Sequence, residues 1–231
     1  MKGSSMIMTI FILVAVALVA VLAMPAEKKL DNTVLNYKEQ GQQQEQEKER
    51  TLQETVINNE SQEIENMETQ QFTKATFETS AGTITLELFT DKAPKTVANF
   101  GKLASEGFYD GVRFHRIIEG FMIQAGDPQS KDEGLKDVWG TGGPGYAFDD
   151  ELPQAGEYEI GSLAMANSGP NTNGYQFFIV SGESGVSLPP LYSLFGKVTN
   201  GMDIVEAIST VTVDGRDRPV EDVMITSITV E

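Results

Sequence analysis

Cysteine is absent from the 231-residue sequence, which excludes disulfides, a thiolate nucleophile and thiolate metal sites. Positive charge is scarce, because 17 Lys and Arg residues stand against 34 Asp and Glu residues, giving a formal charge of −17 at pH 7. Nucleic acids and anionic membrane surfaces attract basic proteins, so this balance argues against both as electrostatic partners. We attribute the acidity to solubility.

Long apolar runs are also rare, and the one that is present covers residues 7–24, broken only by Thr9. At about 18 residues it approaches the length of a membrane-spanning helix and exceeds the apolar region of a secretory signal. We therefore expect residues 1–26 to be an uncleaved signal anchor of a single-pass cell-membrane protein, with the bulk of the chain outside the cytoplasm. Cleavage near 21–23 is the alternative and would release a secreted protein.

Residues 27–71 are dominated by Gln and Glu and contain few large apolar residues. Such a segment cannot bury enough surface to offset the entropy lost on ordering, so we interpret it as a disordered linker. A coiled coil is the alternative, but the apolar spacing does not keep a heptad over three repeats.

The folded domain is expected at residues 72–231. Alternating residues predict a hairpin, 76–79 with 83–88, and further strands at 114–118, 122–124, 161–166, 176–180, 194–198 and 223–230. Helices are predicted at 95–105 and 202–208. Many short strands with only two helices favour a mainly β fold, a closed antiparallel barrel.

One stretch, residues 114–127, reads FHRIIEGFMIQAGD and predicts two strands joined by a tight turn. Strand alternation places His115 and Arg116 on opposite faces, and puts Arg116 on one surface with Met122 and Gln124. That surface has a permanent cation, an amide and apolar groups, but no carboxylate or nucleophile. It suits a neutral substrate better than bond-breaking chemistry, although a core hairpin with a surface arginine is the alternative.

Two further blocks follow, MANSGPNTNGYQFFI at 165–179 and LFGKV at 194–198. Together with 114–127, in this order and spacing, they closely resemble the signature of the cyclophilins, the cyclosporin-binding family of peptidyl-prolyl cis-trans isomerases. The resemblance covers about residues 75–231. It implies an eight-stranded barrel, a monomeric catalytic domain without metal or cofactor, and proline-containing unfolded or extended polypeptides as substrates.

The resemblance also implies the site. The catalytic positions would be Arg116, Phe121 and Gln124, and the substrate-binding positions would be Met122, Thr141, Ala166, Asn167, Ser168, Gln176, Phe178, Leu188 and Tyr192. The large apolar members would enclose the proline ring. Gln124 and the backbone of Asn167 would hydrogen-bond the flanking peptide, while Thr141 and Ser168 would line a neighbouring pocket.

This chemistry needs no covalent intermediate. Rotation about an X-Pro bond crosses a barrier of about 18–20 kcal/mol because the C–N bond is partly double. In the twisted state the prolyl nitrogen regains its lone pair, to which Arg116 can donate a hydrogen bond. No step transfers a proton, so we expect His115 to be a structural, hydrogen-bonded residue.

The sequence departs from the family pattern at 185–192, GVSLPPLY. Many eukaryotic members have Trp about where Ser187 falls and His about where Tyr192 falls, whereas Trp139 lies in the long loop 128–146. We therefore expect cyclosporin to bind only weakly. The leading hypothesis is an isomerase that accelerates folding of exported proteins; the alternative is a prolyl-peptide recruitment module with incidental turnover, which would not require Arg116.

Overall fold

The computed structural model describes Arg50 and residues 71–231. The chain divides into two units, Met1–Gln62 and Glu63–Glu231, and the description below concerns the second. The expected anchor, 1–26, and nearly all of the expected linker, 27–71, lie outside the described residues. Within the described part, no helix is both long and apolar enough to cross a membrane.

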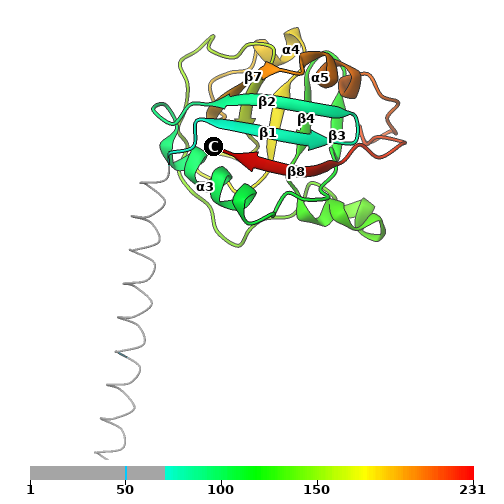
Figure 1. Cartoon of the computed structure of the whole chain (residues 1–231), viewed down its shortest axis with the longest axis horizontal. Coiled ribbons are helices and arrows are strands. Elements are labelled where there is room, and N and C mark those ends of the chain that lie inside the picture. The colour runs from blue at the N-terminus through cyan, green and yellow to red at the C-terminus, as the bar shows by residue number, and fades with distance from the viewer. Residues whose placement is uncertain (1–49, 51–70) are drawn as a thin grey trace, which may run out of the picture. The chain divides into compact units, whose positions relative to one another are not determined.

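Eight antiparallel strands form one sheet (Figure 1). They are β1 (Lys74–Thr79), β2 (Gly82–Leu88), β3 (Arg116–Ile118), β4 (Met122–Ala125), β5 (Ser162–Met165), β6 (Phe177–Val180), β7 (Leu194–Asn200) and β8 (Ile225–Val230). Their order is β3-β4-β6-β5-β7-β2-β1-β8. The predicted mainly β architecture is confirmed, and each predicted strand is found within a few residues of its expected place.

The prediction of a closed barrel is wrong, because β3 and β8 are the two edges of the sheet and do not pair with each other. The chain just before β3 meets β8 instead, through a single bridge between Arg113 and Met224 and a few backbone hydrogen bonds. β3 has only three residues, and its central Ile117 N–H donates to the carbonyl of Asp217 at 2.7 Å. The sheet is therefore an open half-barrel.

Two helices, α3 (Pro94–Ser105) and α5 (Met202–Ser209), match the predicted pair. The Glu151 carboxylate accepts hydrogen bonds from the backbone N–H groups of Lys95 and Thr96, and so caps α3 from a distant loop.

Three short helices were not predicted, namely α4 (Glu183–Val186) and the 3₁₀ turns η1 (Pro128–Lys131) and η2 (Glu133–Val138). They are too short to show helical periodicity. Asp127 and Asp132 start the two 3₁₀ turns, because each carboxylate accepts the N–H two residues further on.

The core lies on the inner face of the sheet, where α3 packs. Phe177 is fully buried there, with its ring centroid 5.5 Å from Phe77, 5.7 Å from Phe100 and 5.4 Å from Tyr109. The next residue, Phe178, points to the opposite face and belongs to a separate, smaller apolar cluster. This alternation along β6 separates the stabilising core from the surface that could bind a ligand.

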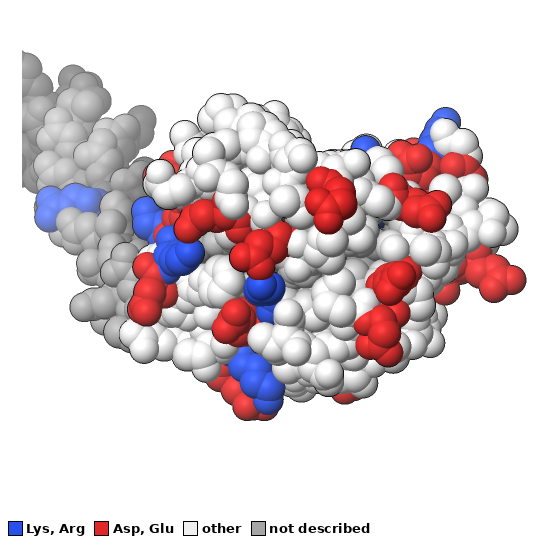
Figure 2. Space-filling view, turned by 90° about the horizontal axis from the view of Figure 1, so that it is seen from above, with Lys and Arg blue, Asp and Glu red and all other residues white. Residues whose placement is uncertain are grey.

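Carboxylates are spread over the face of the domain drawn in Figure 2, and most Lys and Arg groups there lie beside one. Surface pairs such as Lys92 with Glu157, 3.0 Å apart, follow this arrangement. Isolated exposed pairs of this kind contribute little to stability, so the described surface is acidic without a strong electrostatic framework.

Candidate active site

A single row of directly opposed residues crosses four strands on the outer face of the sheet. Arg116 of β3 pairs with Gln124 of β4, Gln124 with Phe178 of β6, and Phe178 with Ala164 of β5. Opposed side chains in antiparallel strands lie about 4.5–5.5 Å apart at Cβ. The register therefore brings a guanidinium, an amide and an aromatic ring into contact range, although Arg116 and Phe178 are 62 positions apart in the chain. This confirms that Arg116 and Gln124 share a face.

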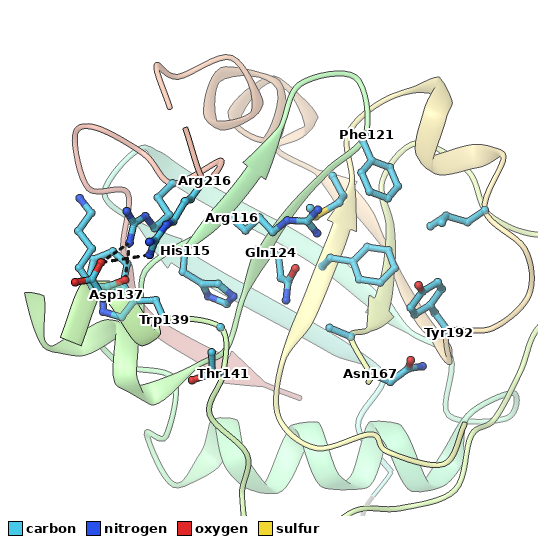
Figure 3. Close-up of a pocket in the computed structure, with 17 residues that line it drawn as sticks. His115, Arg116, Phe121, Gln124, Asp137, Trp139, Thr141, Asn167, Tyr192 and Arg216 are labelled. Atoms are coloured by element: carbon cyan, nitrogen blue, oxygen red, sulfur yellow. Dashed lines mark hydrogen bonds and ion pairs between the residues drawn. The ribbon is translucent and has the colours of Figure 1, made fainter. Parts of the chain in front are cut away.

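The row borders a cavity of about 390 Å³, shown in Figure 3. Ten of the residues expected at the site line it: Arg116, Phe121, Met122, Gln124, Thr141, Ala166, Asn167, Phe178, Leu188 and Tyr192. The other two, Ser168 and Gln176, line an adjoining cavity of about 310 Å³. The two cavities share Gln124, Gly140, Thr141, Ala166 and Asn167 in their walls. The structure thus brings all twelve residues to one continuous groove.

One end of the groove is apolar. Met122 and Phe178 form its floor and are almost fully buried, while Phe121, Leu188 and Tyr192 are partly buried around it. The Tyr192 ring stands edge-on to Phe178, at 5.5 Å between centroids and 87° between planes. A five-membered ring with no polar hydrogen fits such a surface.

The turn that presents Phe121 is held by close backbone packing against the start of α4. Gly182 lies so near Gly120 that a Cβ on it would be 2.4 Å from the Gly120 carbonyl carbon. The N–H of Ser184 donates to Gly120 and that of Ser181 to Phe121, at 3.1 and 3.0 Å. Since α4 leads directly to Leu188, these contacts fix both sides of the apolar end together.

Two glutamines form the middle of the groove. The Gln124 amide nitrogen donates to the side-chain oxygen of Gln176 at 3.0 Å. Gln176 in turn donates to the carbonyls of Gly140 and Gly142, at 3.1 and 3.0 Å. No described residue donates to the side-chain oxygen of Gln124, so this oxygen can accept a peptide N–H.

Asn167 offers its backbone rather than its side chain. Its side-chain nitrogen donates to the Leu191 carbonyl at 2.9 Å, and its side-chain oxygen accepts the Gly169 N–H at 3.2 Å. Among the described residues, nothing hydrogen-bonds its backbone N–H or carbonyl. An extended peptide could therefore pair with this exposed backbone, as a strand does at a sheet edge.

Arg116 extends over the centre of the groove, with 44% of its side chain exposed. Its Nε lies 3.7 Å from the Asp217 carboxylate, and Asp217 is itself tied to β3 through the Ile117 N–H. This loose ion pair contacts the guanidinium through Nε and leaves its terminal nitrogens toward the groove. Its terminal nitrogens have no hydrogen-bond partner among the described residues, so they can donate to a substrate.

His115 is only 3% exposed, yet its ring borders the same cavity as Arg116, so the two are not fully separated by the strand alternation that predicted opposite faces (Figure 3). Neither ring nitrogen makes a hydrogen bond of normal geometry in the described part of the chain, although the Arg113 backbone and the Gln176 side chain lie near enough to raise the pKa of the ring slightly. The ring is held by packing instead, and a Cβ on Gly140 would come within 3.2 Å of it. Burial lowers the pKa of His115 to about 4, against the opposing attraction of the Asp127 carboxylate.

This lowered pKa predicts how stability and activity depend on pH. The unfolded state protonates His115 near pH 6.5 but the folded state only near pH 4, so stability is full above pH 6.5 and falls as the pH drops to 4. Urea unfolding should show about 2 kcal/mol lost between pH 7 and pH 5 from this group. Turnover should be nearly flat from about pH 6 to 8, since the ring stays neutral there.

His115→Gln is the control, because carboxylates also titrate in this range. The difference in stability between the variant and the parent should grow with pH if the neutral ring is the cause. An unchanged pH slope in His115→Gln, or a rate that follows one ionisation near pH 6.5 and loses it in the variant, would show that His115 acts differently.

Sequence reasoning missed the wall of the groove beyond Arg116. It is formed by Lys136, Asp137 and Trp139 from η2 and the following turn, and by Arg216 and Arg218 from a loop before β8. Trp139 was predicted only as a residue of the long loop, yet it is buried at this wall. The one signal in the sequence was the juxtaposition of the single tryptophan with the Gly-rich stretch.

Comparison with known proteins identifies relatives whose described activity fits this site. The family model described as cyclophilin type peptidyl-prolyl cis-trans isomerase/CLD matches residues 74–230. The chain is 46% identical over 174 residues to "Probable peptidyl-prolyl cis-trans isomerase A" of Mycobacterium leprae, covering 68% of this chain and 91% of that protein. It is 44% identical over 149 residues to "Peptidyl-prolyl cis-trans isomerase-like 1" of Mus musculus, covering 64% and 86%.

Solved structures agree. A cyclophilin type peptidyl-prolyl cis-trans isomerase of Cryptosporidium parvum is 34% identical, with a TM-score of 0.62 over 70% of this chain and 98% of that one. A structure of it in the presence of the dipeptide Ala-Pro gives 34% identity and a TM-score of 0.61, over 68% and 98%.

Proposed function

The chain belongs to the cyclophilin-type peptidyl-prolyl cis-trans isomerases, and from this and the geometry of the groove we propose which residues act and on what. The proline ring occupies the apolar end, lined by Phe121, Met122 and Phe178. Gln124 and the Asn167 backbone hold the flanking peptide. Arg116 stabilises the twisted amide. The Ala-Pro dipeptide studied with the Cryptosporidium parvum relative supports a prolyl peptide as the ligand.

The reaction needs only differential binding. The cis and trans forms differ by about 0.5–1 kcal/mol, so the enzyme must favour the twisted state over both planar forms. Twisting makes the prolyl nitrogen pyramidal and frees its lone pair, and the Arg116 guanidinium then donates to it. This hydrogen bond is nearly absent in the planar ground state, where the lone pair is delocalised into the carbonyl.

The observation that carries this proposal is the row Arg116–Gln124–Phe178. It places a permanent donor one strand away from the amide that positions the peptide, and two strands away from the apolar floor. No side chain of the row can act as a nucleophile or general base. The test is catalysis of cis-trans exchange in an Ala-Pro peptide, which should depend on the Arg116 guanidinium.

We further propose that the substrates are exported proteins and that the catalytic domain is tethered to the cell membrane. The apolar run 7–24 supports this, as a segment near the length of a membrane span. The full-length protein should stay with membranes through a high-salt wash, whereas a fragment beginning at Phe72 should be soluble and active. Recovery of the mature protein in the soluble fraction, beginning near Met24, would replace the anchor with a cleaved signal.

Cyclosporin should inhibit this protein poorly. Ser187 is exposed at the end of α4 beside Leu188 and presents no indole to the groove. Loss of a large aromatic contact should weaken binding by about 1–3 kcal/mol, and Ser187→Trp should restore part of it. Titration of parent and variant in the same inhibition assay measures this, and tight inhibition of the parent would contradict it.

A further inference from the structure

The wall of the groove beyond Arg116 is basic, in contrast to the rest of the chain. We call the residues Lys136, Trp139, Arg216 and Arg218 the basic flank. Five charged residues of the described chain line the cavity. Four of them are cations, namely Arg116 and the Lys136, Arg216 and Arg218 of the flank, and the fifth is Asp137. In the whole sequence the ratio is reversed, with 17 cations to 34 carboxylates. A ligand in the groove therefore meets a local excess of positive charge.

The fold holds the basic flank in place by joining two segments far apart in the chain. Arg218 is only 15% exposed, and it donates to the Lys136 carbonyl at 2.7 Å and to the Asp214 carboxylate at 2.9 Å. The Arg218 hydrogen bond lowers the pKa of Asp214 to about 2, so this carboxylate is charged and is already paired with Arg218. The Trp139 indole donates to the Asp132 carbonyl at 2.9 Å. These contacts give the flank a fixed frame.

Arg216 is the exposed cation of the basic flank, whereas Lys136 and Arg218 are partly buried. Its side chain is 64% exposed, and its side-chain partner is Asp137, 3.3 Å away and itself 90% exposed, which also lies 3.8 Å from Arg218 (Figure 3). An ion pair so exposed contributes little, so another carboxylate can replace Asp137 at small cost. Lys136, which lies 5.4 Å from the Trp139 ring centre, adds a second positive charge on the same side.

The adjoining cavity, at the Thr141 and Ser168 side of the groove, is different. None of its lining residues in the described chain is charged. When the proline of a bound peptide occupies the apolar end, the chain on one side of it can run past the uncharged glycines and amides of the adjoining cavity. The chain on the other side can run past the basic flank. The two directions should differ in the side chains they accept.

We propose that the basic flank selects substrates with an acidic side chain near the proline, on the one side of it that runs past Arg216. The inference rests on the proposed function and adds a sequence preference to it. The Arg216 guanidinium pairs with the substrate carboxylate, displacing Asp137. Lys136 and Arg116 contribute long-range attraction, while Asp137 and Asp217 oppose it.

The test measures kcat/KM on the intact protein with a neutral Ala-Pro peptide and with peptides that carry Glu at successive positions on either side of the proline. Glu on one side should raise kcat/KM about two- to fivefold, equivalent to about 0.4–1 kcal/mol, and Glu on the other side should not. Lys at the favoured position should lower it. The preference should shrink between about 0.1 M and 1 M salt.

Arg216→Gln should remove most of the preference. Lys74→Gln is the matched control, since it deletes one equal charge from an exposed pair with Glu231 at the start of β1, and Lys74 lines neither cavity. If Glu is favoured on neither side, or if the preference survives Arg216→Gln and high salt, the basic flank does not select acidic residues. Turnover of the neutral peptide in that case leaves the isomerase assignment standing, whereas its absence in the parent protein overturns the proposed function itself.

Discussion

Arg116→Ala should lower kcat/KM for an Ala-Pro peptide by about two decades, or about 2.7 kcal/mol of transition-state stabilisation. The variant keeps the apolar floor formed by Met122 and Phe178 and the hydrogen-bonding of Gln124, which do not depend on the guanidinium. The loss should therefore fall on the rate of rotation. A protease-coupled assay measures it, with the exchange rate of the peptide by magnetisation-transfer NMR as an independent check.

Arg116→Lys is the informative control, because it keeps the positive charge. A compact ammonium cannot reproduce the planar set of donors, nor hold the Nε contact with Asp217, so it should recover little activity. Full recovery in Arg116→Lys would mean that charge alone drives catalysis. Arg218→Lys is the complementary variant, since it changes the basic flank and leaves the Arg116 guanidinium in place.

Alanine substitutions at the adjacent Phe177 and Phe178 should affect different properties, the first mainly stability and the second mainly activity. Phe177→Ala opens a cavity among Phe77, Phe100 and Tyr109, and should lower the free energy of unfolding by about 3–5 kcal/mol. Phe178→Ala removes the floor of the proline site and should lower kcat/KM by about one to two decades, in line with about 1.5–3 kcal/mol for one buried aromatic side chain. Urea unfolding and the peptide assay separate the two effects.

Phe177→Leu keeps most of the core volume, and guards against a Phe177→Ala variant that is too unstable to assay. Phe177→Leu should be less stable than the parent in urea unfolding. Assayed below the midpoint of its unfolding transition, it should turn over peptide at nearly the same rate. A similar loss of activity in Phe177→Leu and Phe178→Ala would contradict the division of β6 into a core face and a site face.

Strand alternation explains how much of the site could be predicted. In the stretch 114–127, the period of two put Arg116 on one face with Gln124, and the structure agrees. It also put His115 on the opposite face, and that ring is buried but borders the cavity that Arg116 lines. Local pattern was sufficient because β3 and β4 are joined by a tight turn, which fixes their register. The family resemblance then supplied the partners from β6 and from the segment after β5, which no local pattern could place.

The features that were not predicted depend on long-range contacts. Whether the barrel closes is decided by how β3 meets β8, and the two are more than a hundred residues apart. The basic flank likewise needs Arg218 to reach the Lys136 carbonyl across 82 positions. The missing hydrogen bonds of His115 are a property of its packed surroundings, in particular the approach of Gly140.

The most direct test of the central claim measures binding and rotation in one sample. An Ala-Pro peptide is titrated with the parent protein and with Arg116→Ala, and NMR reports the dissociation constant from chemical shifts and the exchange rate from line shapes. If Arg116 acts on the twisted amide, the dissociation constant should change little while the exchange rate falls about a hundredfold. A loss of affinity that accounts for the whole fall in rate would contradict the account, since Arg116 would then hold the planar peptide and not the transition state.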